Sequence, residues 1–192
     1  GNKVNKLIAK NGPQTLAANP IAGAGLATLQ NYRGVAYNPG GNGGKGSIWT
    51  GNFGSDLLEI DLGGKILTTH QLSVNPTATQ WSIYGLAWDS VHQTLWVNSA
   101  PNAGPLREID PKTGKYTGRS FERNSPGTAQ GGLDFVERPG GFNGLVALDQ
   151  STPDAFTGYR IDRWGFPGEK EAVMLSLMGS ASPTPDSPKI FT

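Results

Sequence analysis

Residues 95–118 read LWVNSAPNAGPLREIDPKTGKYTG: an apolar run, a loop rich in Pro, Gly and Asn, a second short run and a tight turn. The turn has a physical reason. Asp110 can accept hydrogen bonds from the backbone two residues on, Pro111 presets φ, and Gly114 can adopt the positive φ that returns the chain antiparallel. A looser copy, IWTGNFGSDLLEIDLGGKILTT, occupies residues 48–69. A hairpin written twice about 50 residues apart predicts stacked supersecondary units.

Three markers recur in the same order along the chain. The first is Gly, an apolar residue, a small or acidic residue and an aromatic, at residues 34–37, 85–88 and 132–135. The second is an apolar run after a turn, at residues 47–50, 94–97 and 144–147. The third is Ile-Asp after a charged residue, at residues 59–61, 108–110 and 160–162. This third marker predicts that Ile60, Ile109 and Ile161 hold equivalent positions in the third strand of successive sheets.

Each unit predicts four short antiparallel strands. The expected strands are residues 34–38, 47–52, 57–61 and 65–72, then 85–89, 94–98, 105–110 and 115–121, then 132–137, 144–149, 157–164 and 170–178. Residues 6–12 align with residues 58–64, so the chain begins halfway through a unit. We therefore divide it into an outer half unit, three complete units and a Ser/Pro-rich tail, at residues 1–30, 31–82, 83–130, 131–178 and 179–192.

The composition agrees with many short strands. The 192 residues include 28 Gly and 14 Pro, a density of turn formers that leaves little room for long helices. Four strands in each unit of about 40 to 50 residues are typical of a β-propeller blade, which stacks on its neighbours to bury both faces. We expect an all-β fold of about three and a half blades, as a fragment or half of a closed ring.

Charge and cysteine content exclude several classes of protein. With 16 basic and 15 acidic residues and no basic stripe, the chain is a poor candidate for nucleic acid or anionic membrane surfaces. No apolar stretch approaches the length of a membrane-spanning helix. The absence of Cys excludes disulfide scaffolds, thiolate zinc sites and thiol nucleophiles. It fits an exported or a cytosolic protein, and we expect a secreted or periplasmic one.

The stretch GLAWDSVHQTLWVNSAPNAGPLREIDPKTGKYTG, residues 85–118, resembles blades of a superfamily of six- or seven-bladed propellers. That superfamily holds the NHL-repeat proteins, the YVTN/YWTD-type surface proteins, the gluconolactonase/regucalcin-like lactonases and the streptogramin lyases. The run from Asp89 to Val97 and the turn Ile-Asp-Pro-x-Thr-Gly-Lys at residues 109–115 carry the resemblance. Because these motifs encode turns, they indicate architecture and say little about chemistry.

The resemblance implies one metal site. Lactonases of this superfamily hold a central divalent cation with Glu, Asn and Asp side chains at the inner ends of blades, a set of oxygen ligands that suits calcium. Residues in comparable places are Asn52, Asn98, Asp134 and Asp149. Apart from these residues, the second and third units do not match the sequence signatures of the lactonases. The alternative is that Asn52 and Asn98 cap strand ends and that Asp149 starts a turn.

Other polar residues predict structure more than chemistry. Asp61, Asp110 and Asp162 recur at the same outer turn of each unit, where turn capping accounts for them. His70 and His92 occupy different places in their units and are interpreted as surface histidines. The loop NPGGNGGKGS, residues 38–47, joins two strands and opens no helix, so it is no phosphate cradle.

The sequence favours a binding or scaffold module without catalytic activity of its own, for a protein or for a small-molecule or carbohydrate ligand. The alternative is a lactonase-like or lyase-like enzyme with a cation at the axis, completed by missing blades or a second chain. A half unit also leaves an open arc with unpaired sheet faces. A twofold dimer could close one ring, and truncation of a larger propeller is the competing account.

Overall fold

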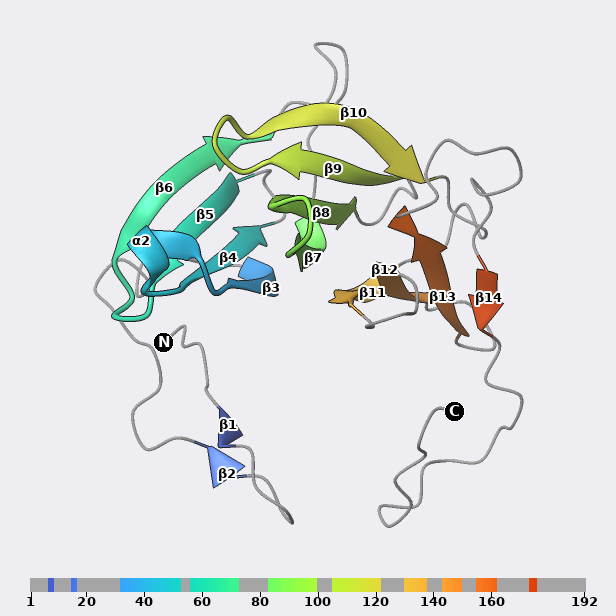
Figure 1. The fold of residues 1–192 in the computed structure, drawn as a ribbon, viewed down its shortest axis with the longest axis horizontal. Helices are drawn as coiled ribbons and strands as arrows, with labels where there is room; N and C mark the ends of the chain where they lie inside the picture. The colour runs from blue at the N-terminus through green and yellow to red at the C-terminus, as the bar shows by residue number, and fades with distance from the viewer. Residues whose placement is uncertain are drawn as a thin grey trace.

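The computed structural model describes residues 7–8, 15–16, 32–52, 56–72, 83–99, 105–121, 130–137, 143–149, 155–161 and 173–175. These residues form three four-stranded antiparallel sheets and one two-stranded sheet. Figure 1 shows the three larger sheets following one another around an arc. The predicted all-β class is confirmed.

In the three larger sheets, the strands follow one another in chain order from the inside of the arc to the outside (Figure 1). The first sheet holds β3 (Tyr32–Asn38), β4 (Ser47–Asn52), β5 (Asp56–Asp61) and β6 (Ile66–Gln71). The second holds β7 (Ile83–Asp89), β8 (Thr94–Ser99), β9 (Leu106–Asp110) and β10 (Lys115–Phe121). The third holds β11 (Gln130–Val136), β12 (Gly144–Asp149), β13 (Ala155–Arg160) and β14 (Val173–Leu175). A short helical segment, α2 (Gly41–Gly44), lies between β3 and β4, and β1 (Leu7–Ile8) pairs with β2 (Thr15–Leu16).

The three sheets share one register between their first two strands. In each, a residue of the inner strand pairs with the third residue of the next strand: Ala36 with Trp49, Ala87 with Trp96, and Asp134 with Val146. The first sequence marker, which begins with Gly, therefore aligns the inner strands of the three sheets correctly. Residues that this register matches are called equivalent.

The third marker is correct for two sheets. Ile60 pairs with Ile48 in the first sheet, and Ile109 pairs with Leu95 in the second. Both isoleucines are buried. They are equivalent, as the sequence predicts.

In the third sheet, the predicted position of Ile161 is wrong by two residues. Leu145 pairs with Tyr159, so Tyr159 fills the position that Ile60 and Ile109 hold elsewhere. Ile161 follows β13 directly, and its N–H donates to the Asn143 carbonyl at 2.9 Å. Because alternate residues of a strand share a face, a two-residue slip keeps the same side chains in the core, and the pattern of apolar residues cannot detect it.

Two hydrophobic clusters join the sheets. The cluster between the first and second sheets includes Ala36, Trp49 and Leu57 from one side and Leu86, Trp88, Leu95 and Val97 from the other. The cluster between the second and third sheets includes Ala87, Trp96 and Phe121 from one side and Leu133, Leu145, Ala147 and Tyr159 from the other. Consecutive residues of β8 therefore serve different clusters, because side chains alternate across a strand. The second sheet is buried on both faces.

The inner strands β3, β7 and β11 line the inside of the arc, which we call the inner edge (Figure 1). They approach one another closely at glycines. A Cβ at Gly34, whose φ is +67°, would lie 3.1 Å from the Leu86 nitrogen, and a Cβ at Gly85 would lie 3.0 Å from the Gly131 carbonyl oxygen. Each inner strand also has a register shift beside these glycines. Glycine is needed there because no side chain fits between the backbones.

No helix among the described residues has the length and apolar character needed to cross a membrane.

Candidate functional site

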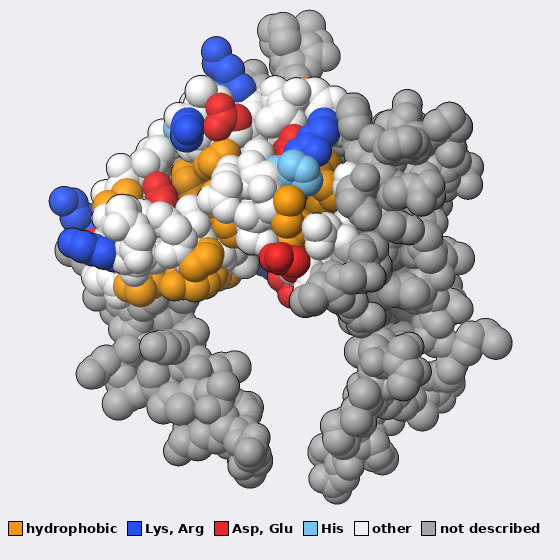
Figure 2. All heavy atoms as spheres, viewed as in Figure 1, with side chains coloured by type: hydrophobic (Ala, Val, Ile, Leu, Met, Phe, Trp, Pro, Cys, Tyr) orange, Lys and Arg blue, Asp and Glu red, His pale blue; other side chains and the backbone are white. Residues whose placement is uncertain are grey.

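A pocket of about 280 Å³ lies at the inner edge, where all three sheets contribute. Its lining comes from the second half of each inner strand and the residues that follow: Val35, Ala36, Tyr37, Pro39, Leu86, Ala87, Trp88, Ser90, Asp134, Phe135 and Glu137. Figure 2 shows hydrophobic and acidic side chains along this edge of the arc. The pocket thus combines apolar walls with carboxylate oxygens.

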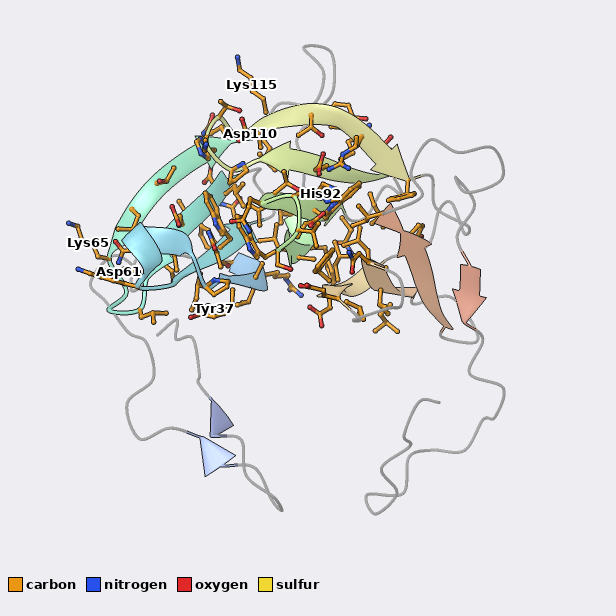
Figure 3. All side chains as sticks on the ribbon, viewed as in Figure 1. Tyr37, Asp61, Lys65, His92, Asp110 and Lys115 are labelled. Carbon is orange, nitrogen blue, oxygen red and sulfur yellow. The ribbon has the colours of Figure 1, made fainter. Side chains whose placement is uncertain are left out.

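Three aromatic side chains of the pocket hold equivalent positions. Tyr37, Trp88 and Phe135 each pair with the second residue of the neighbouring strand. Tyr37 is exposed and lies on the inner side of the first sheet (Figure 3), Phe135 is half-buried, and Trp88 is buried. The Nε1 atom of Trp88 has no hydrogen-bond partner within the described part of the chain. Together they give the pocket aromatic surface from every sheet.

The polar part of the pocket is acidic. The Ser90 hydroxyl donates to Glu137 Oε2 at 2.7 Å, which joins the turn after β7 to the end of β11. Asp134 Oδ1 accepts a hydrogen bond from the Phe135 N–H at 2.9 Å. Both carboxylates belong to exposed residues. As acceptors, they suit a ligand that brings hydroxyl or N–H donors.

Asn52, the first predicted ligand, lies at the end of β4 and binds the loop toward β5. Its Nδ2 donates to Asp56 Oδ2 at 2.9 Å, and its Oδ1 accepts from the Asp56 N–H at 2.8 Å. These two bonds close the connection between the strands. The strand-end capping interpretation is confirmed for this residue.

Asn98 makes a bond between sheets. It is fully buried in β8, and its Nδ2 donates to the Gly131 carbonyl of β11 at 3.0 Å. Its Oδ1 is buried and has no hydrogen-bond partner within the described residues. The register makes Asn98 equivalent to Gly51 and Asn52 equivalent to Ser99, so the two asparagines point to opposite faces of their sheets.

The three predicted ligands whose side chains are described do not gather in one place. Asn52 and Asn98 pair with Tyr32 and Gly85, near the start of the inner strands, whereas Asp134 lies beyond the register shift and lines the pocket. Asp149 pairs with Gln130 through its backbone, and its side chain lies outside the described residues. Within the described part, no three His, Cys, Asp or Glu side chains are grouped as metal ligands. Among the described side chains, Asn52 and Asp134 therefore do not join the orphaned Asn98 Oδ1, and these three residues do not fit a shared calcium ion.

The outer aspartates cap turns, as predicted. Asp61 Oδ1 accepts from the N–H groups of Gly63 and Lys65, both at 2.8 Å. Asp110 Oδ1 accepts from the Lys112 N–H at 2.9 Å, and this bond is the main reason that the pKa of Asp110 lies below its usual value. Figure 3 shows the two aspartates at separate outer turns. Asp162 lies outside the described residues.

Both histidines have structural contacts. The His92 Nδ1 lies 2.8 Å from Oδ2 of Asp89, a fully buried carboxylate. His70 stacks on Trp49 with ring centroids 6.2 Å apart, and its Nε2 lies 2.9 Å from the Pro111 carbonyl of the second sheet. His70 therefore joins two sheets, a role that the sequence did not reveal because Pro111 is 41 residues away.

Glu108 is a buried polar residue whose role the sequence did not reveal. It accepts hydrogen bonds from Thr94 at 2.7 Å and Thr117 at 2.5 Å, and it forms an ion pair with Arg119. Burial alone raises the pKa of Glu108, but the bonds from Arg119, Thr117 and Thr94 outweigh burial and hold the pKa below its usual value. The recurrence of Glu before Ile-Asp was the available signal, because Glu59 makes a similar bond to Ser47 at 2.5 Å.

Comparison of the sequence with models of known protein families gave no match, and comparison with curated proteins gave no relative.

Proposed function

We propose that the chain is a binding module whose ligand occupies the pocket at the inner edge. The observation that carries this proposal is the convergence of β3, β7 and β11 on one pocket. A concave site lined by aromatic surface with a few polar groups is the usual form of a small-molecule site. Three sheets contribute to the pocket, so stacking of the sheets holds its walls in place.

The lining chemistry favours a small ligand rich in hydrogen-bond donors, such as a carbohydrate. Asp134 and Glu137 supply acceptor oxygens, and the aromatic residues Tyr37, Trp88 and Phe135 supply apolar surface. A polyhydroxylated molecule has an apolar face and many hydroxyl donors, so it can satisfy both kinds of surface at once.

Within this proposal the chain is a blade-containing relative of the NHL, YVTN and gluconolactonase-like propellers, secreted or periplasmic, and without catalytic activity of its own. The support is the sheet architecture together with the turn motifs at residues 85–118. The lactonase-like alternative depends on a cation site, and the described side chains do not bring its ligands together.

The test is a titration of the full chain with a panel of monosaccharides and disaccharides, followed by backbone amide NMR shifts. We expect the shifts to cluster at Tyr37, Trp88, Phe135 and Glu137. The variant Glu137→Gln should weaken the response about tenfold, because it replaces one charged acceptor. Asp61→Asn is the matched control, since Asp61 lies at an outer turn (Figure 3), and it should leave the titration unchanged. Shifts that avoid the pocket, or no shift with any member of the panel, would overturn the proposal.

A further inference from the structure

The first sheet exposes apolar side chains that its neighbours bury. Val35 and Tyr37 of β3 are 56% and 55% exposed, whereas Leu86 and Trp88, their equivalents in β7, are 1% and 8% exposed. Leu133, equivalent to Val35 in the third sheet, is 8% exposed. The residue type is similar in all three sheets, so the neighbourhood makes the difference.

The neighbour that buries these positions is the preceding sheet. Leu86 and Trp88 pack in one cluster with Ala36 and Trp49 of the first sheet. In the same way, Leu133 packs with Ala87 and Trp96 of the second sheet, and Phe135 packs against that cluster. Each sheet therefore has a receiving face, defined by the positions of Val35 and Tyr37, and a covering face, defined by the positions of Ala36 and Trp49.

The third sheet has a covering face of its own. Asp134 and Val146 are equivalent to Ala36 and Trp49. Asp134 is exposed and Val146 is half-buried, whereas Ala36 and Trp49 are buried. Among the described residues, the chain thus carries one exposed receiving face at β3 and one partly exposed covering face at the third sheet.

These two faces complement each other in a polar detail. The aromatic of the receiving face is Trp88 in the second sheet and Phe135 in the third, but it is Tyr37 in the first. The small residue that shares a cluster with this aromatic is Ala36 for Trp88 and Ala87 for Phe135, and the third sheet has Asp134 at the equivalent position. A tyrosine hydroxyl can donate to a carboxylate. The Tyr37 hydroxyl therefore lies on the receiving face of the first sheet, and the Asp134 carboxylate lies on the covering face of the third sheet. Within the described part of the chain, neither of these two faces has a partner sheet.

We propose that a second copy of this chain docks the covering face of its third sheet on the receiving face of the first sheet, with Asp134 of one copy against Tyr37 of the other. Because both side chains also line the pocket, this contact competes with the ligand proposed above. The contact continues the sheet-on-sheet packing that already occurs twice within each chain. It is heterologous, so it either closes a ring or extends into a chain of copies. Exposed apolar surface of this kind is typical of an interaction site.

The test uses light scattering of the full chain over a concentration series, with far-UV circular dichroism as the check on folding. We expect a mass above the 20.2 kDa of one chain, rising with concentration. Tyr37→Asp places two carboxylates together and should raise the apparent Kd by about tenfold or more. Asp134→Lys should also weaken self-association, because it removes the acceptor for the Tyr37 hydroxyl.

A mixture of the two variants gives the decisive result. In a mixed pair, the carboxylate introduced by Tyr37→Asp in one copy meets the ammonium group introduced by Asp134→Lys in the other, and the second contact keeps the native Tyr37 and Asp134. We expect the mixture to recover the mass that each variant alone loses. An interface between two identical faces would show no such recovery, and this outcome would overturn the proposal.

The matched controls are Val91→Asp and Leu62→Asp, which charge exposed apolar residues at other turns, 47% and 44% exposed. They should leave the mass unchanged. A wild-type chain that stays at the single-chain mass at the highest concentration would also overturn the proposal.

Discussion

The second and third sheets share a register but differ in what fills it. Trp96 of the second sheet is buried, with its ring centroid 5.3 Å from that of Phe121, whereas the equivalent residue of the third sheet is the half-buried Val146. The strand opposite carries Glu108 in the second sheet and Gly158 in the third. The same backbone pairing thus holds Trp96 opposite the buried Glu108 carboxylate in the second sheet. In the third sheet it holds the smaller Val146 opposite a glycine.

The difference follows from the neighbours of each sheet. The second sheet lies between two others, so both faces of β8 need large side chains to fill the space between sheets. Its buried Glu108 is satisfied by Thr94, Thr117 and Arg119, and the Arg119 guanidinium also lies 5.9 Å from the Trp96 ring centroid. The middle sheet is therefore where we expect most of the sensitivity to mutation.

The largest expected effect comes from Trp96→Ala. Removing a fully buried tryptophan leaves a cavity between the second and third sheets, and it should lower the free energy of unfolding by about 3–5 kcal/mol. Val146→Ala is the matched change in the third sheet and should cost less than about 2 kcal/mol. Urea denaturation followed by circular dichroism measures both. Equal losses of unfolding free energy at the two positions would show that the second sheet is no more sensitive to mutation than the third.

Glu108→Gln should follow in size. It leaves Arg119 without its carboxylate partner inside a partly closed site, at a cost of about 2–3 kcal/mol. Glu59→Gln, the equivalent change in the first sheet, should cost less, because Glu59 bonds to Ser47 and more weakly to Thr68 at 3.4 Å. The same denaturation experiment applies. A larger loss for Glu59 would reverse the ranking of the two networks.

The pH dependence of stability should identify the same carboxylate. The pKa of Glu108 is lower in the folded chain than its usual value of 4.5. A depressed pKa contributes stability that is present above the unfolded pKa and is lost as pH falls through the folded pKa. Wild-type stability should therefore decline below about pH 4.5, and the decline should be shallower in Glu108→Gln. Parallel pH profiles for the two proteins would contradict this assignment.

The smallest expected effect concerns the histidines. His70→Gln removes the stacking on Trp49 and should cost about 1 kcal/mol. His92→Gln changes a side chain at an exposed turn and should stay within about 0.5 kcal/mol. Thermal unfolding compares the two variants. A larger effect for His92 would mean that its contact with Asp89 matters more than the contact between sheets.

The sequence by itself determined most of the strands and turns of this protein, except the register of the third strand in the third sheet. The predicted second strand, residues 47–52, coincides with β4, and residues 144–149 coincide with β12. The capping of turns by Asp61 and Asp110 was also predictable. These features depend on side-chain alternation and on hydrogen bonds between residues a few positions apart, and both are present in the local sequence.

Only the tertiary structure decided which side chains meet. The Nδ2 of Asn98 donates to the carbonyl of Gly131, 33 residues away, and the pocket is lined by three separate strands. The exposure of Val35 and the burial of Leu86 could not be told apart from their sequences, because both follow a glycine in the same marker. Their difference arises from the presence or absence of a packed neighbouring sheet. That is a property of long-range stacking, which no single strand encodes.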